Sequence, residues 1–129
     1  MRPLLVRLWA LPWTLFGLSI GLLSLATGGS VLRVQGTLGF AGGAARAFLR
    51  LAPLAHGANA MTLGHVVLGR SEDVLKAAYE HELVHVRQYE RWGPLFVPAY
   101  FAAAAWQWLH GRDPYWDNPF EREAYRVAP

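Results

Sequence analysis

The sequence predicts an α+β fold that is mainly helical, with a small antiparallel sheet. Segments 31–40 and 60–68 are rich in branched residues and bounded by glycine, which is typical of strands. Residues 72–92 lie between a serine and a Gly-Pro pair, which indicates a helix. Two apolar stretches, 4–26 and 95–109, predict long apolar helices. At 129 residues the chain is long enough for a single modest core.

The N-terminal stretch 4–26 is almost wholly apolar and allows three interpretations. It is long enough for a transmembrane helix, which needs about 20 apolar residues. It also fits a helix buried in the domain, or a cleaved secretory signal with basic residues near its start. Pro12 would start or kink a helix and so shortens the usable span. We expect residues 1–27 to form a membrane anchor or a buried helix, and residues 28–129 to form the main domain.

The strands are expected on either side of a short helix. Residues 31–40 predict a hairpin with Gln35-Gly36 as its turn, because glycine readily adopts positive φ. Residues 44–51 predict a short helix, closed by the proline that follows. Residues 60–68 predict one continuous strand, which ends at a glycine.

The next helix has clear signals at both ends. Ser71 is a good N-cap, and Glu72 and Asp73 in the first turn interact favourably with the helix dipole. Gly93-Pro94 predicts its end, because glycine adopts the terminating conformation and proline cannot continue a helix.

The second apolar stretch, 95–109, is too short to cross a membrane comfortably. As a helix its 15 residues reach about 22 Å, against the ~30 Å hydrocarbon core of a bilayer. We therefore expect it to fold back on the preceding helix as part of the core. Beyond it, Asn118 as N-cap and Pro119 at the first helical position predict a last helix.

Residues 81–85 read HELVH, a HExxH motif inside the predicted helix. His81 and His85 are four positions apart, so they share one helix face and can offer ring nitrogens to one zinc ion at roughly 2.0–2.1 Å. Glu82 can reach a water on that ion and act as its general base. The chain has no cysteine, so histidine and carboxylate must supply all ligands. The alternative interpretation of the motif is that it is an ordinary charged turn of a solvent-exposed helix, with no metal.

A catalytic zinc normally has three protein ligands, and HExxH supplies two. Glu121 and Glu123, on the predicted last helix, are the candidates for the third. Glu121 also stands three residues after Asn118, where a capping-box glutamate would bond back to the Asn118 amide. From the residues alone, a metal ligand and a helix cap are equal alternatives for the role of Glu121.

The succession of a HExxH helix, an apolar segment and the Glu121-x-x-Ala124-Tyr125 helix resembles the gluzincin zinc peptidases. It looks most like the membrane zinc peptidases of the CAAX-protease type and their small soluble relatives, the minigluzincins. The resemblance covers residues 61–125, about half of the chain. It implies a minimal zincin-like fold.

The resemblance also implies the roles of individual residues. It makes His81, His85 and Glu121 the zinc ligands and Glu82 the general base. Tyr125 stands where the family has an aspartate that braces a metal-bound histidine, which puts that contact in doubt here. In such enzymes an edge strand beside the motif helix pairs with extended substrate, and residues 62–68 resemble it.

Other polar residues have weaker claims to a functional role. His65 could face the site from its strand, although such a histidine is more often an ordinary half-exposed residue. Tyr125 could donate to a ligand or an oxyanion, or simply pack. Glu123 is expected to point away from the metal, and Gln88 is expected at the surface. His56 and His110 fit no pattern.

The function predicted from these features is a zinc-dependent metallopeptidase that hydrolyses peptide bonds by zinc-activated water, with Glu82 as general base. The alternative is a non-catalytic membrane-associated protein with a structural or decayed metal site. A peptide or protein substrate is expected. The expected location is at a membrane, through residues 4–26, and the second choice of location is the cytoplasm. The 12 basic residues are scattered and not interleaved with aromatics, so no nucleic-acid partner is expected.

Overall fold

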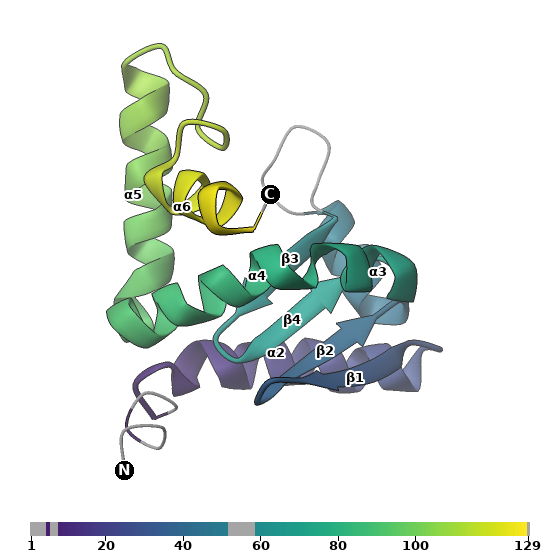
Figure 1. Ribbon diagram of the computed structural model, residues 1–129. Helices are drawn as coiled ribbons and strands as arrows, with labels where there is room; N and C mark the ends of the chain where they lie inside the picture. The colour runs from purple at the N-terminus through teal and green to yellow at the C-terminus, as the bar shows by residue number, and fades with distance from the viewer. Residues whose placement is uncertain (1–4, 6–7, 52–58, 129) are drawn as a thin grey trace.

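The computed structural model of the protein describes residues 5, 8–51 and 59–128, and it is a mainly helical α+β fold (Figure 1). The elements in chain order are α2 (Leu11–Ala26), β1 (Ser30–Val34), β2 (Thr37–Ala41), α3 (Gly43–Arg50), β3 (Ala60–Leu63), β4 (Val66–Gly69), α4 (Glu72–Trp92), the 3-10 turn η1 (Gly93–Leu95), α5 (Phe96–Leu109) and α6 (Pro119–Val127).

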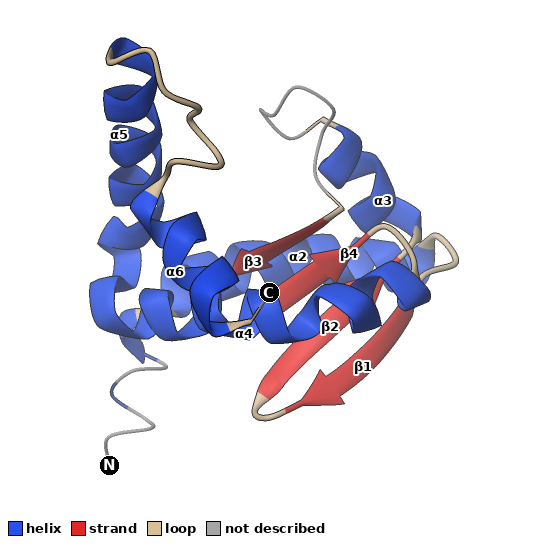
Figure 2. Cartoon of the chain, turned by 45° about the horizontal axis from the view of Figure 1, so that its top comes forward, coloured by secondary structure: helices blue, strands red, loops and turns tan. Residues whose placement is uncertain are grey.

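The four strands form one sheet in the order β1-β2-β4-β3 (Figure 2). β1 and β2 pair antiparallel, as do β3 and β4, but β2 and β4 run parallel. The expectation of an antiparallel sheet was therefore wrong for the central pair. Parallel neighbours require a crossover, and α3 with the segment after it supplies the connection from β2 to the second hairpin. β3 is left at one edge of the sheet.

The predicted single strand 60–68 is also wrong, because the chain reverses inside it. Gly64 has a φ of +64°, and Leu63 pairs with Val66 across the turn. Glycine accepts this left-handed conformation without strain. The first hairpin is confirmed, with positive φ at both Gln35 (48°) and Gly36 (78°), the geometry that matches the twist of the flanking strands.

The two faces of the sheet carry different helices. Val66 and Leu68 point into a cluster with α2 and α3, whereas Val67 between them packs against α4. This alternation is the two-residue period of a strand buried on both sides. The protein therefore has three layers, with α2 and α3 on one face of the sheet and α4 on the other (Figures 1 and 2).

α2 packs on the sheet through its smallest residues. A Cβ atom added to Gly17 would lie 2.8 Å from the Cβ of Val66, and one added to Gly21 would overlap the ring of Phe40. Ile20 and Ser24 are buried on the same side. One face of the predicted N-terminal apolar helix is thus part of the domain core.

The long apolar helices expected at 4–26 and 95–109 are shorter in the described residues. α2 has 16 residues and α5 has 14. Within the described ranges, no helix is both long and apolar enough to span a bilayer.

Replacing Gly21 by valine is expected to lower the free energy of unfolding by about 1–3 kcal/mol, because the added side chain overpacks the contact with Phe40. Chemical denaturation measures the change. Ala26→Val, at an exposed position of the same helix, is the matched control and should stay within about 0.5 kcal/mol of wild type. Equal stability of the two variants would contradict this packing.

α4 begins and ends at the residues that the sequence predicted, and α6 begins where it predicted. Ser71 accepts a hydrogen bond from the amide of Val74, and Gly93, with a φ of 59°, follows the last residue of α4. The side chain of Asn118 accepts from the amide of Phe120 at the start of α6. These caps fix where the HExxH residues and the last glutamates lie along their helices.

The expectation that residues 95–109 form core was wrong. Only Phe96 of α5 is buried, and Trp106 and Trp108 are exposed. α5 leaves the end of α4 at a steep angle, and the chain then returns so that α6 lies across α4 (Figure 1). The physical reason is that α6, not α5, covers the histidine face of α4.

Candidate metal centre

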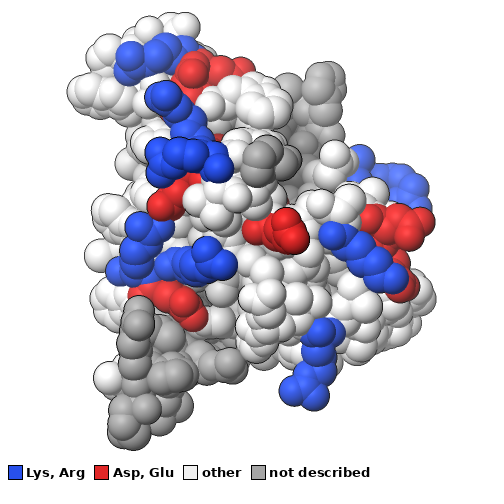
Figure 3. Space-filling view, in the orientation of Figure 1, with Lys and Arg blue, Asp and Glu red and all other residues white. Residues whose placement is uncertain are grey.

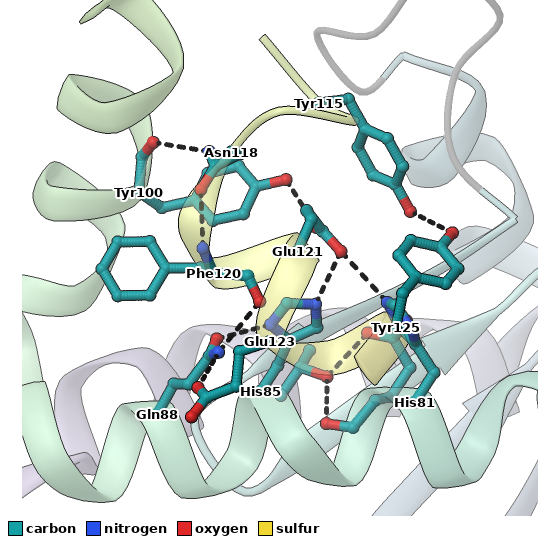
Figure 4. A network of polar contacts seen from close by, with 12 residues as sticks. His81, His85, Gln88, Tyr100, Tyr115, Asn118, Phe120, Glu121, Glu123 and Tyr125 are labelled. Atoms are coloured by element: carbon teal, nitrogen blue, oxygen red, sulfur yellow. Dashed lines mark hydrogen bonds and ion pairs between the residues drawn. The ribbon is translucent and has the colours of Figure 1, made fainter. Parts of the chain in front are cut away.

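Two histidines of α4 and one glutamate of α6 meet in a buried cluster (Figure 4). The Nε2 atoms of His81 and His85 each lie 3.0 Å from Oε1 of Glu121. One ligand atom from each residue lies within 4.8 Å of the others, so the group could hold a metal ion. Tetrahedral sites with bonds of roughly 2.0–2.1 Å separate their ligand atoms by about 3.3 Å, and the observed contacts are close to this spacing.

Glu121 faces the histidines and does not cap its own helix. Its Oε1 contacts both histidines, and its Oε2 accepts a hydrogen bond from the hydroxyl of Tyr100 at 2.6 Å. The Asn118 amide, which a capping-box glutamate would bind, donates instead to the carbonyl of Tyr115. The geometry therefore favours the ligand alternative over the cap.

Glu123 points to a different part of α4. Its Oε1 accepts hydrogen bonds from Nε2 of Gln88 and from the guanidinium of Arg91, each at 2.6 Å. The hydrogen bond from Gln88 and the charge of Arg91 lower the pKa of Glu123. Glu123 is thus a neighbour of the cluster and not one of its three converging groups.

Gln88 is fully buried beside His85, so its predicted surface position was wrong. Its Nε2 lies against two acceptors, the carbonyl of Phe120 at 3.0 Å and the Glu123 carboxylate. This fixes the orientation of the amide, and its Oε1 must accept from Nδ1 of His85 at 2.7 Å. With Nδ1 donating to Gln88, Nε2 is the nitrogen of His85 that faces the cluster, and it could bind a metal ion once its own proton is displaced.

Replacing Gln88 by leucine is expected to lower metal affinity by about 10–100-fold, because His85 loses the acceptor that sets its tautomer and ring orientation. A competition titration with a zinc chelator measures the affinity. Gln107→Leu on α5 is the matched control and should bind as wild type. A folded Gln88→Leu protein with unchanged affinity would exclude this role.

His81 has a different environment. Its ring packs against Tyr125 at a centroid distance of 4.3 Å, and its Nδ1 is buried without a hydrogen-bond partner among the described residues. The Tyr125 hydroxyl instead pairs with the hydroxyl of Tyr115 at 2.8 Å. Tyr125 therefore holds the imidazole by packing and not by a hydrogen bond.

Glu82 is buried between α4 and the edge strand β3. Its Oε1 accepts a hydrogen bond from the hydroxyl of Thr62 at 2.9 Å, and its Oε2 lies 4.0 Å from Nε2 of His81. Burial raises the pKa of Glu82, and the nearby histidines and Thr62 only partly oppose this effect. A carboxylate with a raised pKa beside candidate metal ligands is suited to accept a proton.

Charges within the cluster are strongly coupled. Burial alone would raise the pKa of Glu121, but hydrogen bonds from His81 and His85 hold it at about 2. Burial would lower the pKa of His85, and the contact with Glu121 instead raises it to about 9. Without metal the two form an ion pair, so a metal ion must displace the proton on Nε2 of His85.

Tyr100 and Thr62 contact the acidic groups of the site, and the sequence predicted neither contact. Tyr100 is the member of α5 that reaches the cluster, and burial raises the pKa of its hydroxyl. The side chain of Asn118 donates to the Tyr100 carbonyl at 3.1 Å, which joins the start of α6 to α5. A lone tyrosine in an apolar segment was the signal available for Tyr100, and Thr62 offered none.

His65 does not join the cluster. It lies in the turn between β3 and β4, where its Nε2 pairs with the carboxylate of Glu90 at 2.9 Å. Glu90 is nine positions after His81, about 180° round the helix, so this pair lies on another side of α4. A surface hollow lined in part by His65, Arg87 and Glu90 is likewise separate from the metal-ligand candidates.

His110 does not join the cluster either. His110 packs on Trp106 at the end of α5, and His56 lies outside the described residues.

No family model, curated protein or solved structure matches this chain. Its function must therefore be inferred from the chemistry and geometry of the residues themselves.

Proposed function

We propose that the protein is a zinc-dependent metallopeptidase of the gluzincin type, with His81, His85 and Glu121 as ligands and Glu82 as general base. The observation that carries this proposal is the position of Oε1 of Glu121, 3.0 Å from the Nε2 atoms of both histidines. Two imidazoles and one carboxylate are the donor set of many catalytic zinc sites.

The groups around the cluster support hydrolysis. A zinc ion bound there would polarise a carbonyl oxygen and make water more acidic. Glu82 would accept the proton of the attacking water and later deliver it to the leaving amine. Thr62 holds one oxygen of this carboxylate, which leaves the other directed toward His81. Thr62 belongs to the edge strand β3, where an extended peptide could add by strand pairing.

A structural metal site is the second candidate, and the closure of the cluster favours it. The side chains of His81, His85 and Glu121 are only 12, 7 and 7% exposed. Structural zinc sites are closed, whereas catalytic sites keep one position open to water or substrate.

Metal content and turnover separate these candidates. The full chain, dialysed against zinc and then against buffer, is expected to retain one zinc per molecule by mass spectrometry. Incubation with a mixed peptide library should yield cleavage products that disappear with a chelator and return with added zinc. One zinc without cleavage would support the structural site. Absence of zinc binding would overturn both.

A further inference from the structure

The outer face of α2 is an exposed apolar surface. Its inner residues pack on the sheet, whereas its other side presents large apolar side chains to the exterior, each between 37 and 64% exposed. We call this surface the α2 face; it consists of Leu11, Leu15, Phe16, Leu22, Leu23 and Leu25.

The hydroxyl groups beside the α2 face are turned back onto the helix. Ser19 donates to the carbonyl of Leu15 at 3.0 Å, and Thr27 donates to the carbonyl of Leu23 at 2.7 Å. Hydroxyl groups of helices in lipid satisfy their donors in this way, because no water is available there. These two hydroxyl groups therefore need no hydrogen-bond acceptor from whatever covers the α2 face.

The first 71 residues of the sequence, which include α2 and α3, carry charges of one sign. All nine acidic residues of the chain follow residue 71, whereas six of the twelve basic residues precede it. Arg46 and Arg50 are exposed, one turn apart on α3, and α3 packs beside α2 through the rings of Phe48 and Phe16 at 6.0 Å. By contrast, both signs of charge are mixed on the face that carries α4 and α6 (Figure 3).

We infer that the α2 face docks on the surface of an anionic lipid bilayer, with Arg46 and Arg50 at the lipid headgroups. An apolar helix face beside basic side chains is the combination that binds such surfaces. α2 would lie in the plane of the interface, because its inner side is held by the sheet. The metal cluster, which lies on the other side of the sheet, would then face away from the lipid. This inference does not depend on the metal or on peptidase activity.

Co-sedimentation of the full chain with vesicles tests the inference. The protein is expected to bind vesicles of phosphatidylcholine with 30% phosphatidylglycerol (about a third anionic lipid), and to bind pure phosphatidylcholine much more weakly. Leu15→Gln/Leu22→Gln should lower the partition coefficient at least ~10-fold. Leu95→Gln/Leu109→Gln, at exposed positions outside α2, is the matched control and should bind as wild type.

The arginines provide a second and independent measurement. Arg46→Gln/Arg50→Gln should lose about fivefold in partition coefficient for each arginine at low salt, and Arg46→Lys/Arg50→Lys should restore binding. Circular dichroism verifies that each variant is folded. Equal binding to neutral and anionic vesicles, or unchanged binding of the leucine variant, would overturn the inference. Concentration-dependent dimerisation that the leucine variant abolishes, without lipid binding, would assign the face to a second copy instead.

Discussion

Replacing Glu82 by glutamine is expected to lower kcat by about 10²–10⁴-fold while the protein keeps its zinc. The amide cannot accept the proton of the attacking water, but Glu82 is not one of the three converging groups that could bind the ion. Peptide turnover and zinc content are measured on the same preparation. Glu80→Gln, two residues earlier at an exposed position of α4, is the matched control and should retain activity.

Two results would contradict the role assigned to Glu82. Full activity in Glu82→Gln would exclude it as the general base. If Glu82→Gln lost zinc as completely as a histidine variant, Glu82 would be a ligand of the ion, and its assignment as a non-ligand general base would be wrong.

Replacing either histidine by alanine is expected to abolish zinc uptake, and Glu121→Gln should weaken zinc binding by more than about 100-fold. Residues that only support a ligand typically account for 10–100-fold, so loss of a ligand should exceed that range. Isothermal titration measures the affinity. Glu123→Gln is the matched control; it should have a smaller effect because Glu123 contacts Gln88 and Arg91, not the histidines.

The same variants also test the capping role. If Glu121→Gln kept its zinc but destabilised the metal-free protein by about 1 kcal/mol, Glu121 would be a cap after all. If Glu123→Gln instead lost more affinity than Glu121→Gln, the third ligand would be Glu123.

Local signals were enough to place the candidate cluster. The four-residue spacing of His81 and His85 defines one helix face wherever that helix lies in the fold. The cap at Asn118 fixes the start of α6, and Glu121 and Glu123 must then point in directions about 200° apart. What the spacing left open was which of the two glutamates reaches the histidines. The structure turns Glu121 toward them, and Glu123 contacts Gln88 and Arg91 farther along α4.

Features that depend on tertiary contacts could not be predicted in this way. A run of buried apolar residues has the same composition whether it forms one strand or two, so Gly64 gave only a weak signal for the turn. Gln88 is buried because α6 covers it, and Tyr100 of α5 reaches Glu121 only because α6 returns to α4. No periodicity in the segments of these two residues indicates either contact. α5 was expected in the core because the segment is apolar and too short to cross a membrane. Its exposed side chains show that apolar composition and length do not decide burial.

His85 and Glu121 are 36 positions apart, so an ion that binds both closes a long loop. Closing a loop of that length in an unfolded chain costs about 3–4 kcal/mol in conformational entropy. Packing of α6 on α4 already holds His85 and Glu121 together without an ion. An ion that binds there would therefore not have to close this loop itself. The converse also follows: local opening of α6 removes a ligand, and a bound ion suppresses that opening by mass action. Closure of α6 on α4 and retention of a bound ion would thus be linked, and each would stabilise the other.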